Sequence, residues 1–512
     1  LALISGVFLF MTRQTIINVS RYIEFDLKNE IYAHYQKLGY TFFKKNSTGD
    51  LMNRIAEDVS HVRMYLGPGI MYTVNLFFLS IMVIASMVQI SGFMTLVVLL
   101  PLPIMSVIIY KVASRINRIS TTVQKEQSNM STLVQETFSG IRVVKAYGRV
   151  KETEERFNES AEQYMKKSMR LVLVNSLFMP TIFILIGVST ILCIYIGGLL
   201  TYENVISSGE ILMFIIFVNK LTWPFASIGW VTSLVQRAAA SQTRINEFLQ
   251  ETPEIINTVH SDFDFKGNIE FRRVSYTYPN SGIRAVHDLS FQLKEGETLG
   301  IVGHTGSGKS TILHLLMRQI EPDSGQILID GVDIKDINLD LFREQTGVVP
   351  QDVFLFSESI RDNLLFGSVH TPVSDEQLVE VTTAAHVHHN IIEFKDGYET
   401  LLGERGVNLS GGQKQRISIA RALIRAPKLL ILDDCLSAVD TETEEIILQQ
   451  LKRIQTRTSL VVSHRISSIR NASKVITVRD GMVVEAGTHD ELLQLNGEYA
   501  EMYRKQLSEE VA

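Results

Sequence analysis

The sequence has few cysteines and no excess of positive charge. It holds two cysteines in 512 residues, Cys193 within an apolar run and Cys435 beside an acidic pair. Neither position indicates a disulfide framework or a metal site. The formal net charge is −6, so there is no basic surplus to attract a nucleic acid, and we expect no such partner. No secretory signal peptide is visible either.

Apolar residues are abundant instead, and they crowd into the first half of the chain. Apolar residue types make up 46% of the sequence, and five long apolar segments lie at 1–19, interrupted by Arg13, and at 66–88, 93–110, 171–197 and 211–230. A membrane helix needs about 20 such residues. Little amphipathic helix is left over to cover so much apolar surface in a soluble protein. The sequence therefore predicts an α-helical transmembrane bundle over residues 1–250.

Two of the connections between these segments are long, charged and compatible with helix. Residues 20–65 and 111–170 carry many lysines and arginines, and the positive-inside rule places such connections in the cytosol. We expect each to be a helical hairpin, with its tip at 45–51 in the first and at 140–147 in the second.

The pattern changes after residue 250. Residues 251–267 are polar and irregular and read as a linker. From 268 to 508, short predicted strands, at 269–278, 289–293, 298–302 and 326–329 among others, alternate with helical stretches. This alternation is typical of an α/β domain with a largely parallel core sheet.

The most informative stretch of this second domain is a glycine-rich loop between a predicted strand and a predicted helix. Its glycines let backbone N–H groups converge on phosphates at a helix N-terminus. Lys309 adds a full positive charge, and the Ser310 hydroxyl is of the type that ligates Mg²⁺. The residues that we expect to bind a nucleoside triphosphate here are Gly303, His304, Thr305, Gly306, Ser307, Gly308, Lys309, Ser310 and Thr311.

A second anion-binding helix start follows about 100 residues later. Ser410 is a candidate N-cap, and Gly411 and Gly412 leave the backbone of the helix start bare before Gln413. The apolar strand at 428–432 then ends in Asp433 and Asp434. Two carboxylates at a strand end are where a P-loop enzyme holds Mg²⁺ and positions the attacking water.

Over essentially the whole chain, these motifs resemble those of the ATP-binding cassette exporters, P-loop ATPase domains fused to a membrane domain. The five-residue signature at 409–413 distinguishes that family from other P-loop proteins. The resemblance implies ATP and Mg²⁺ as cofactors. It implies that Tyr278 stacks on adenine, that Gln351 senses Mg²⁺, that Asp433 ligates it, and that His464 lies near the γ-phosphate.

The resemblance also implies an assembly. In this family the signature of one chain closes over the P-loop nucleotide of another, with the loop at 437–440 crossing between them, and the tips at 45–51 and 140–147 acting as coupling helices. Segment 403–406 resembles the part that touches the cytosolic arms. ATP binding and hydrolysis would then drive export of hydrophobic or amphiphilic compounds through the cell membrane, with the ATPase domain in the cytosol. The family has six spans, so we expect one more helix before Leu1.

One catalytic position departs from the family pattern. The family usually has Glu after the Mg²⁺ carboxylate, and this chain has Asp434. The shorter side chain sets its carboxylate back by about 1.5 Å, and a misplacement of about 1 Å can cost a hundredfold in rate. We therefore expect catalysis by Asp434, His464 and Gln351 to be slow, and favour a heterodimer with a second half-transporter over a homodimer. The alternative function is a regulatory or channel-like subunit with little ATP turnover.

Three further features have open or ordinary interpretations. Lys220 and Arg13 lie within apolar segments, where charge is expensive. Each is a candidate for lining the transport cavity, although Lys220 could instead pair with a neighbouring carbonyl group or face water between subunits. His386, His388 and His389 have no cysteine or carboxylate at ligand spacing, so we interpret them as a solvated helix face.

Overall fold

The computed structural model describes residues 2–368, 372–453 and 458–511. Its chain divides into two compact units, of which the first is Leu1–Lys37 with Asn46–Glu251. The second unit is Leu38–Lys45 with Thr252–Ala512. Each unit has its own core and is described by itself.

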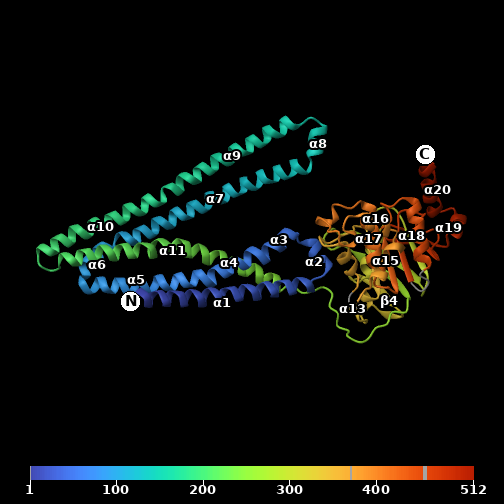
Figure 1. The fold of residues 1–512 in the computed structure, drawn as a ribbon, viewed down its shortest axis with the longest axis horizontal. Helices are drawn as coiled ribbons and strands as arrows, with labels where there is room; N and C mark the ends of the chain where they lie inside the picture. The colour runs from blue at the N-terminus through green and yellow to red at the C-terminus, as the bar shows by residue number, and fades with distance from the viewer. Residues whose placement is uncertain (1, 369–371, 454–457, 512) are drawn as a thin grey trace. The chain divides into compact units, whose positions relative to one another are not determined.

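The first unit is built from helices alone in the part that the structure describes (Figure 1). Five helical stretches are long and apolar enough to cross a membrane, as the sequence predicts. The α-helices are α1 (Ala2–Lys37), α3 (Thr48–Asn53), α4 (Val59–Met64), α5 (Ile70–Ile90), α6 (Gly92–Leu99), α7 (Pro101–Ser139), α8 (Ile141–Ala146), α9 (Val150–Ser176), α10 (Phe178–Tyr202) and α11 (Ser208–Leu249). Two short π-helical segments, Arg54–Asp58 and Tyr65–Gly69, flank α4.

The ends of these helices follow from local sequence. Ser207 and Glu210 form a capping box that starts α11, and the Ser91 side chain caps α6. The expected tip at 140–147 is the short helix α8 between the long arms α7 and α9. At the other expected tip, Ser47 caps α3 by accepting from the Asp50 N–H. Both tips are therefore helical.

Two features hold the first unit together. A buried apolar cluster joins α5, α6, α7, α10 and α11 and includes Met87, Met94 and Phe214. Elsewhere the Arg244 guanidinium of α11 pairs with Asp58, a carboxylate that is only 4% exposed, with Nε 3.0 Å from Oδ2. A buried carboxylate needs such a partner, and here the pair ties α11 to the π-helical segment before α4. The side chains of Arg13 and Lys220 are exposed.

The second unit contains two sheets. The larger has the order β10-β9-β3-β8-β7-β6, with all neighbours parallel except the antiparallel pair β10 and β9. The smaller is antiparallel with the order β2-β1-β4-β5. The strands are β1 (Ile269–Thr277), β2 (Arg284–Leu293), β3 (Thr298–Val302), β4 (Ser324–Ile329), β5 (Val332–Asp333), β6 (Thr346–Val349), β7 (Leu429–Asp433), β8 (Thr458–Val462), β9 (Lys474–Arg479) and β10 (Met482–Gly487).

The predicted parallel core sheet is confirmed, but the separate antiparallel sheet was not predicted. Strand alternation alone does not say which short strands pair with which. The predicted strand at 298–302 has the observed bounds, whereas β2 begins at Arg284 instead of at residue 289. Of residues 284–288, on the edge strand of this sheet, only Val286 is buried. Their mixed polarity gave no clear strand pattern.

Helices pack on both sheets through two buried apolar clusters. Those that matter for the site are α12 (Lys309–Leu316), α17 (Gly411–Leu423), α18 (Thr441–Arg453), α19 (His489–Leu495) and α20 (Glu498–Val511). The short helix α2 (Tyr40–Lys45) also belongs to this unit, although none of its residues is buried. The interpretation of the three histidines as a solvated face is wrong for two of them. His386 and His388 are half-buried, and His388 lies 2.9 Å from the Tyr398 hydroxyl. Within the described ranges, no group of three or more His, Cys, Asp or Glu side chains could hold a metal ion.

Candidate nucleotide site

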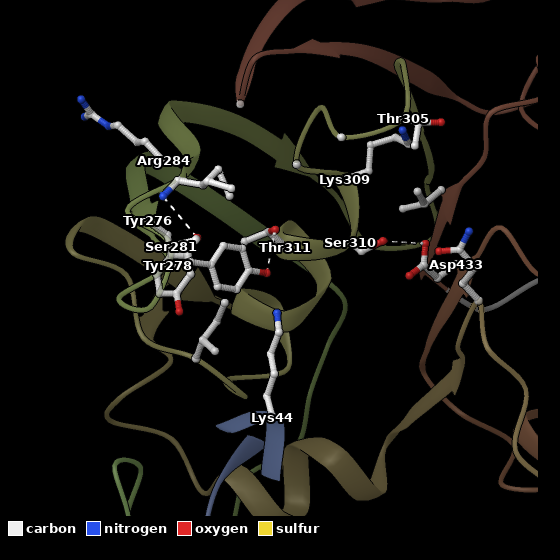
Figure 2. A pocket seen from close by; sticks show the side chains of 18 of the residues that line it. Lys44, Tyr276, Tyr278, Ser281, Arg284, Thr305, Lys309, Ser310, Thr311 and Asp433 are labelled. Carbon is white, nitrogen blue, oxygen red and sulfur yellow. Dashed lines mark hydrogen bonds between the residues drawn. The ribbon is translucent and has the colours of Figure 1, made fainter. Parts of the chain in front are cut away.

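A cavity of about 730 Å³ opens beside the carboxyl ends of β3, β7 and β8 (Figure 2). Parallel α/β sheets bind ligands at this edge because loops and helix starts converge there. The cavity brings together residues from five separate sequence motifs. Those predicted from sequence and found in its lining are Tyr278, Thr305, Gly306, Gly308, Lys309, Ser310, Thr311, Gln351, Asp433, Asp434 and His464.

The glycine-rich loop is shaped by close backbone approaches. A Cβ on Gly303 would lie 2.1 Å from the carbonyl oxygen of Val478. A Cβ on Gly308, whose φ is +98°, would lie 2.1 Å from the carbonyl oxygen of Ala285. No other residue type fits these positions without moving the backbone. The loop is therefore packed against its neighbours and is not a flexible linker.

Lys309 stabilises the loop from inside. Its ammonium donates to the carbonyl oxygens of Gly303 at 2.7 Å and His304 at 2.8 Å, and lies 3.5 Å from the Ser307 hydroxyl. Burial lowers the pKa of Lys309, although the Asp434 and Asp433 carboxylates act in the opposite direction. The ammonium is thus held at the cavity with backbone acceptors that an incoming phosphate oxygen can replace.

Ser310 and Asp433 place two oxygen atoms, each able to ligate a metal ion, close together in the lining of the cavity. The Ser310 hydroxyl lies 3.5 Å from Oδ1 of Asp433. Burial, and the like charge of Asp434, raise the pKa of Asp433. A buried carboxylate with a raised pKa gains from a nearby cation, and Mg²⁺ prefers oxygen ligands of these kinds. The pair fits a magnesium site.

Asp434 lies at a backbone position that few side chains adopt. Its φ is +45°, and its N–H donates to the Val462 carbonyl oxygen at 2.8 Å. Its carboxylate lies 2.7 Å from Nδ1 of His464 and accepts from the Gln351 amide at 3.4 Å. The structure therefore brings together the three residues to which the sequence assigned catalysis, at one end of the cavity.

Tyr278 forms the other end of the cavity. Its hydroxyl lies 3.1 Å from that of Thr311, and the Tyr276 ring packs edge-on against it. The ammonium of Lys44, from α2, lies 4.4 Å from the centre of the Tyr278 ring (Figure 2). Sequence analysis missed Lys44 because it lies more than 200 residues before the P-loop. No local motif marks such a contact.

The second anion-binding helix start lies in a different place. Ser410 is the N-cap of α17, as predicted, and Gln413 completes a capping box that was not predicted, each side chain accepting from the other residue's backbone N–H. Ser410, Gly411 and Gly412 line a separate hollow of about 340 Å³ together with Ala438 and Asp440. These residues are not among those lining the P-loop cavity. Within one chain, the two elements predicted to bind phosphate therefore line different cavities.

Comparison with known proteins finds relatives for both parts of the chain. The family profile of the ABC transporter transmembrane region matches residues 1–225, and the ABC transporter profile matches residues 286–437. The chain is 37% identical over 484 residues to a probable multidrug resistance ABC transporter ATP-binding/permease protein, YheI, of Bacillus subtilis, which covers 94% of this chain and 82% of that protein. It is 32% identical to an ATP-dependent lipid A-core flippase of Syntrophus aciditrophicus, covering 95% and 80% of the two chains.

A solved structure has the same fold. The structure of a bacterial Atm1-family ABC exporter with ATP bound matches with a TM-score of 0.82 at 24% identity, over 98% of this chain and 89% of that chain.

Proposed function

This chain belongs to the ATP-binding cassette transporters, as a multi-pass membrane exporter of multidrug or lipid type, and on that premise we propose that its own P-loop site holds Mg²⁺ with ATP and hydrolyses ATP slowly. Half-transporters of this type dimerise, and their nucleotide-binding domain is cytoplasmic. What distinguishes this chain's site from that general description is Asp434.

Each part of the site has an assigned role in the proposal. Tyr278 offers a ring face to the base, and Lys309 with the N–H groups of the loop binds phosphate. Ser310, Asp433 and Gln351 hold Mg²⁺, which neutralises phosphate charge. Asp434 orients the attacking water, and His464 fixes the Asp434 carboxylate through the 2.7 Å contact.

The single observation that supports slow hydrolysis is the position of Asp434. Its short carboxylate is drawn toward two partners, His464 and Gln351, on a backbone with positive φ. A glutamate at this position would reach about 1.5 Å further toward a bound phosphate. Positioning errors of about 1 Å can cost a hundredfold in rate.

The test is the variant Asp434→Glu. We expect the turnover number to rise about tenfold to a hundredfold while the KM for ATP stays within about threefold. Asp433→Glu is the matched control, since it adds the same methylene at the neighbouring carboxylate and should lower turnover. An Asp434→Glu protein that turns over at the parental rate would contradict the proposal.

A slow site is useful to a transporter whose partner supplies a fast one. The signature helix start of this chain, Ser410 to Gln413, is fully formed, so the chain can complete a P-loop site on another subunit. We therefore propose a heterodimer with a second half-transporter. Co-expression with adjacent half-transporters, followed by purification through a tag on this chain alone, should recover a one-to-one complex. Recovery of a homodimer with full turnover would contradict both parts of the proposal.

The proposed substrates are hydrophobic or amphiphilic compounds. The support is the similarity to a probable multidrug resistance transporter and to a lipid A-core flippase, together with the exposed Lys220 within α11. If Lys220 lines the transport path, it favours anionic or zwitterionic amphiphiles. Lys220→Ala should then reduce their transport in vesicles by about tenfold and leave cationic dyes unaffected. Equal transport of anionic compounds by both proteins would refute this role.

The second candidate is a regulatory subunit that binds ATP with little turnover, and Asp434 also motivates it. Substrate-stimulated ATPase activity in vesicles containing the dimer supports export. Nucleotide binding without turnover, alone and with the partner, would favour the regulator.

A further inference from the structure

A glutamine from the C-terminal helix contacts both sides of the His464 turn. The side-chain amide of Gln506 donates to the His464 carbonyl oxygen at 2.6 Å, and its oxygen accepts from the Ile466 N–H at 2.9 Å. The two bonds bracket the peptide units on either side of Arg465. One side chain thus satisfies both a donor and an acceptor of a turn that has no regular secondary structure.

The helix that carries Gln506 is anchored independently of this contact. Tyr499 is fully buried in the apolar cluster beneath α17 and β7, and Met502 packs with it. The Glu485 carboxylate accepts from the N–H groups of Glu498 and Tyr499 at 2.8 and 2.9 Å, which satisfies the start of α20. Gln506 is therefore presented by a rigid support, and its replacement leaves these anchors in place.

The opposite side of the same turn is tied to the loop that follows Asp434. Arg465 donates to the carbonyl oxygens of Ser437 at 3.0 Å and Val439 at 3.3 Å. Its guanidinium also lies 3.5 Å from Glu444, a carboxylate only 2% exposed that accepts from the Ser468 hydroxyl as well. A buried carboxylate bound in this way fixes Arg465.

We propose that Gln506 is a positioning residue for His464, holding the turn at 464–466 so that the imidazole meets the Asp434 carboxylate. Gln506 does not line the P-loop cavity, so its effect passes through the backbone of His464. The turn is then held at two places. Gln506 of α20 binds its backbone, and Glu444 of α18 pairs with the side chain of its central residue, Arg465. Because movement of the turn would displace the imidazole from the Asp434 carboxylate, the rate of hydrolysis at this site depends on α20.

The main test separates positioning from general stability. Gln506→Met keeps the length of the side chain and removes both hydrogen bonds. We expect the turnover number to fall about tenfold, with the KM for ATP and the melting temperature nearly unchanged. Gln506→Glu keeps the acceptor for Ile466 and loses the donor to His464, so its turnover should be intermediate. Lys505→Ala, an exposed neighbour on the same helix, is the control and should match the parent.

A double-mutant cycle tests whether the effect passes through His464. In a His464→Ala background, adding Gln506→Met should cause no further loss, because the side chain that Gln506 positions is gone. A further tenfold loss in that background would overturn the proposal, as would an equal fall in Lys505→Ala. If the protein is a heterodimer, every sample also carries a substitution of the partner's catalytic carboxylate. Only the site on this chain's P-loop then hydrolyses ATP.

This inference rests on the proposed role of His464 at the P-loop site, and the two can fail separately. If His464→Ala has parental turnover, the assignment of the site fails. If His464→Ala is slow while Gln506→Met is not, the site stands and only the role of Gln506 is refuted.

Discussion

The hydroxyl of Tyr278 lies 3.1 Å from the hydroxyl of Thr311, the last residue of the predicted phosphate-binding loop. This contact connects the two ends of the cavity, since Thr311 lies within α12 directly behind Lys309 and Ser310. The ring of Tyr278 is thereby oriented by the element that binds phosphate. The ring face is occupied by the Lys44 ammonium, and a base that stacks there replaces one favourable contact of the ring with another.

The Tyr278 ring is expected to contribute most of the affinity for the base. Stacking of a base on an aromatic side chain is worth about 1–3 kcal/mol, so Tyr278→Ala should weaken ATP binding roughly fivefold to 150-fold. Tyr278→Phe keeps the ring and loses only the hydrogen bond to Thr311, so the change should stay within about fivefold. Titration with a fluorescent ATP analogue measures both. Equal ATP affinities of the Ala and Phe variants would show that stacking on the Tyr278 ring does not contribute to ATP binding.

Two glycines of the P-loop should differ sharply in their tolerance of alanine. Both have positive φ, +85° for Gly306 and +98° for Gly308, but a Cβ has open space only at Gly306. Gly306→Ala therefore bears only backbone strain, about 1–2 kcal/mol, and should still bind ATP. Gly308→Ala also forces a collision with the Ala285 carbonyl, and we expect it to lose ATP binding. Nucleotide binding and thermal unfolding of the two proteins, compared side by side, check this. Similar losses in both would contradict it.

The carboxylate of Asp433 is expected to lower the stability of the nucleotide-free domain. Its pKa is raised by burial and by Asp434, so the folded chain binds its proton more tightly than the unfolded chain does. Its contribution to stability is thus most favourable below the ordinary carboxyl pKa and is lost as pH rises through the raised pKa. Without Mg²⁺, Asp433→Asn should raise the melting temperature at pH 7.5 by roughly 2–4 °C, and the gain should shrink as pH falls.

Asp440 provides the control of opposite sign. Hydrogen bonding from the Thr443 backbone N–H, then from its hydroxyl, lowers the pKa of this exposed carboxylate. Its contribution to stability is present above the ordinary carboxyl pKa and is lost as pH falls through the lowered pKa. Asp440→Asn should therefore lower the melting temperature at pH 7.5. A gain in stability from both substitutions would contradict the role assigned to burial at Asp433.

Local sequence determined much of the fold and part of the site. The five apolar stretches predicted spanning helices because length and hydropathy are properties of a single segment. The N-cap of α17 by Ser410 was predicted for the same reason, since a cap depends on residues next to the helix start. Strand pairing was harder to predict from the sequence. Only the structure shows that β1, β2, β4 and β5 form a separate antiparallel sheet.

The sequence by itself determined that this protein binds nucleotide and spans a membrane, because a P-loop and an apolar helix are each formed by one continuous segment of the chain. Tertiary structure decided which distant side chains reach that site. The Lys44 ammonium on the Tyr278 ring, and Gln506 on the turn after His464, join residues 234 and 42 positions apart. Such contacts arise when separate elements pack into one core, so they cannot be predicted from periodicity or spacing along the chain.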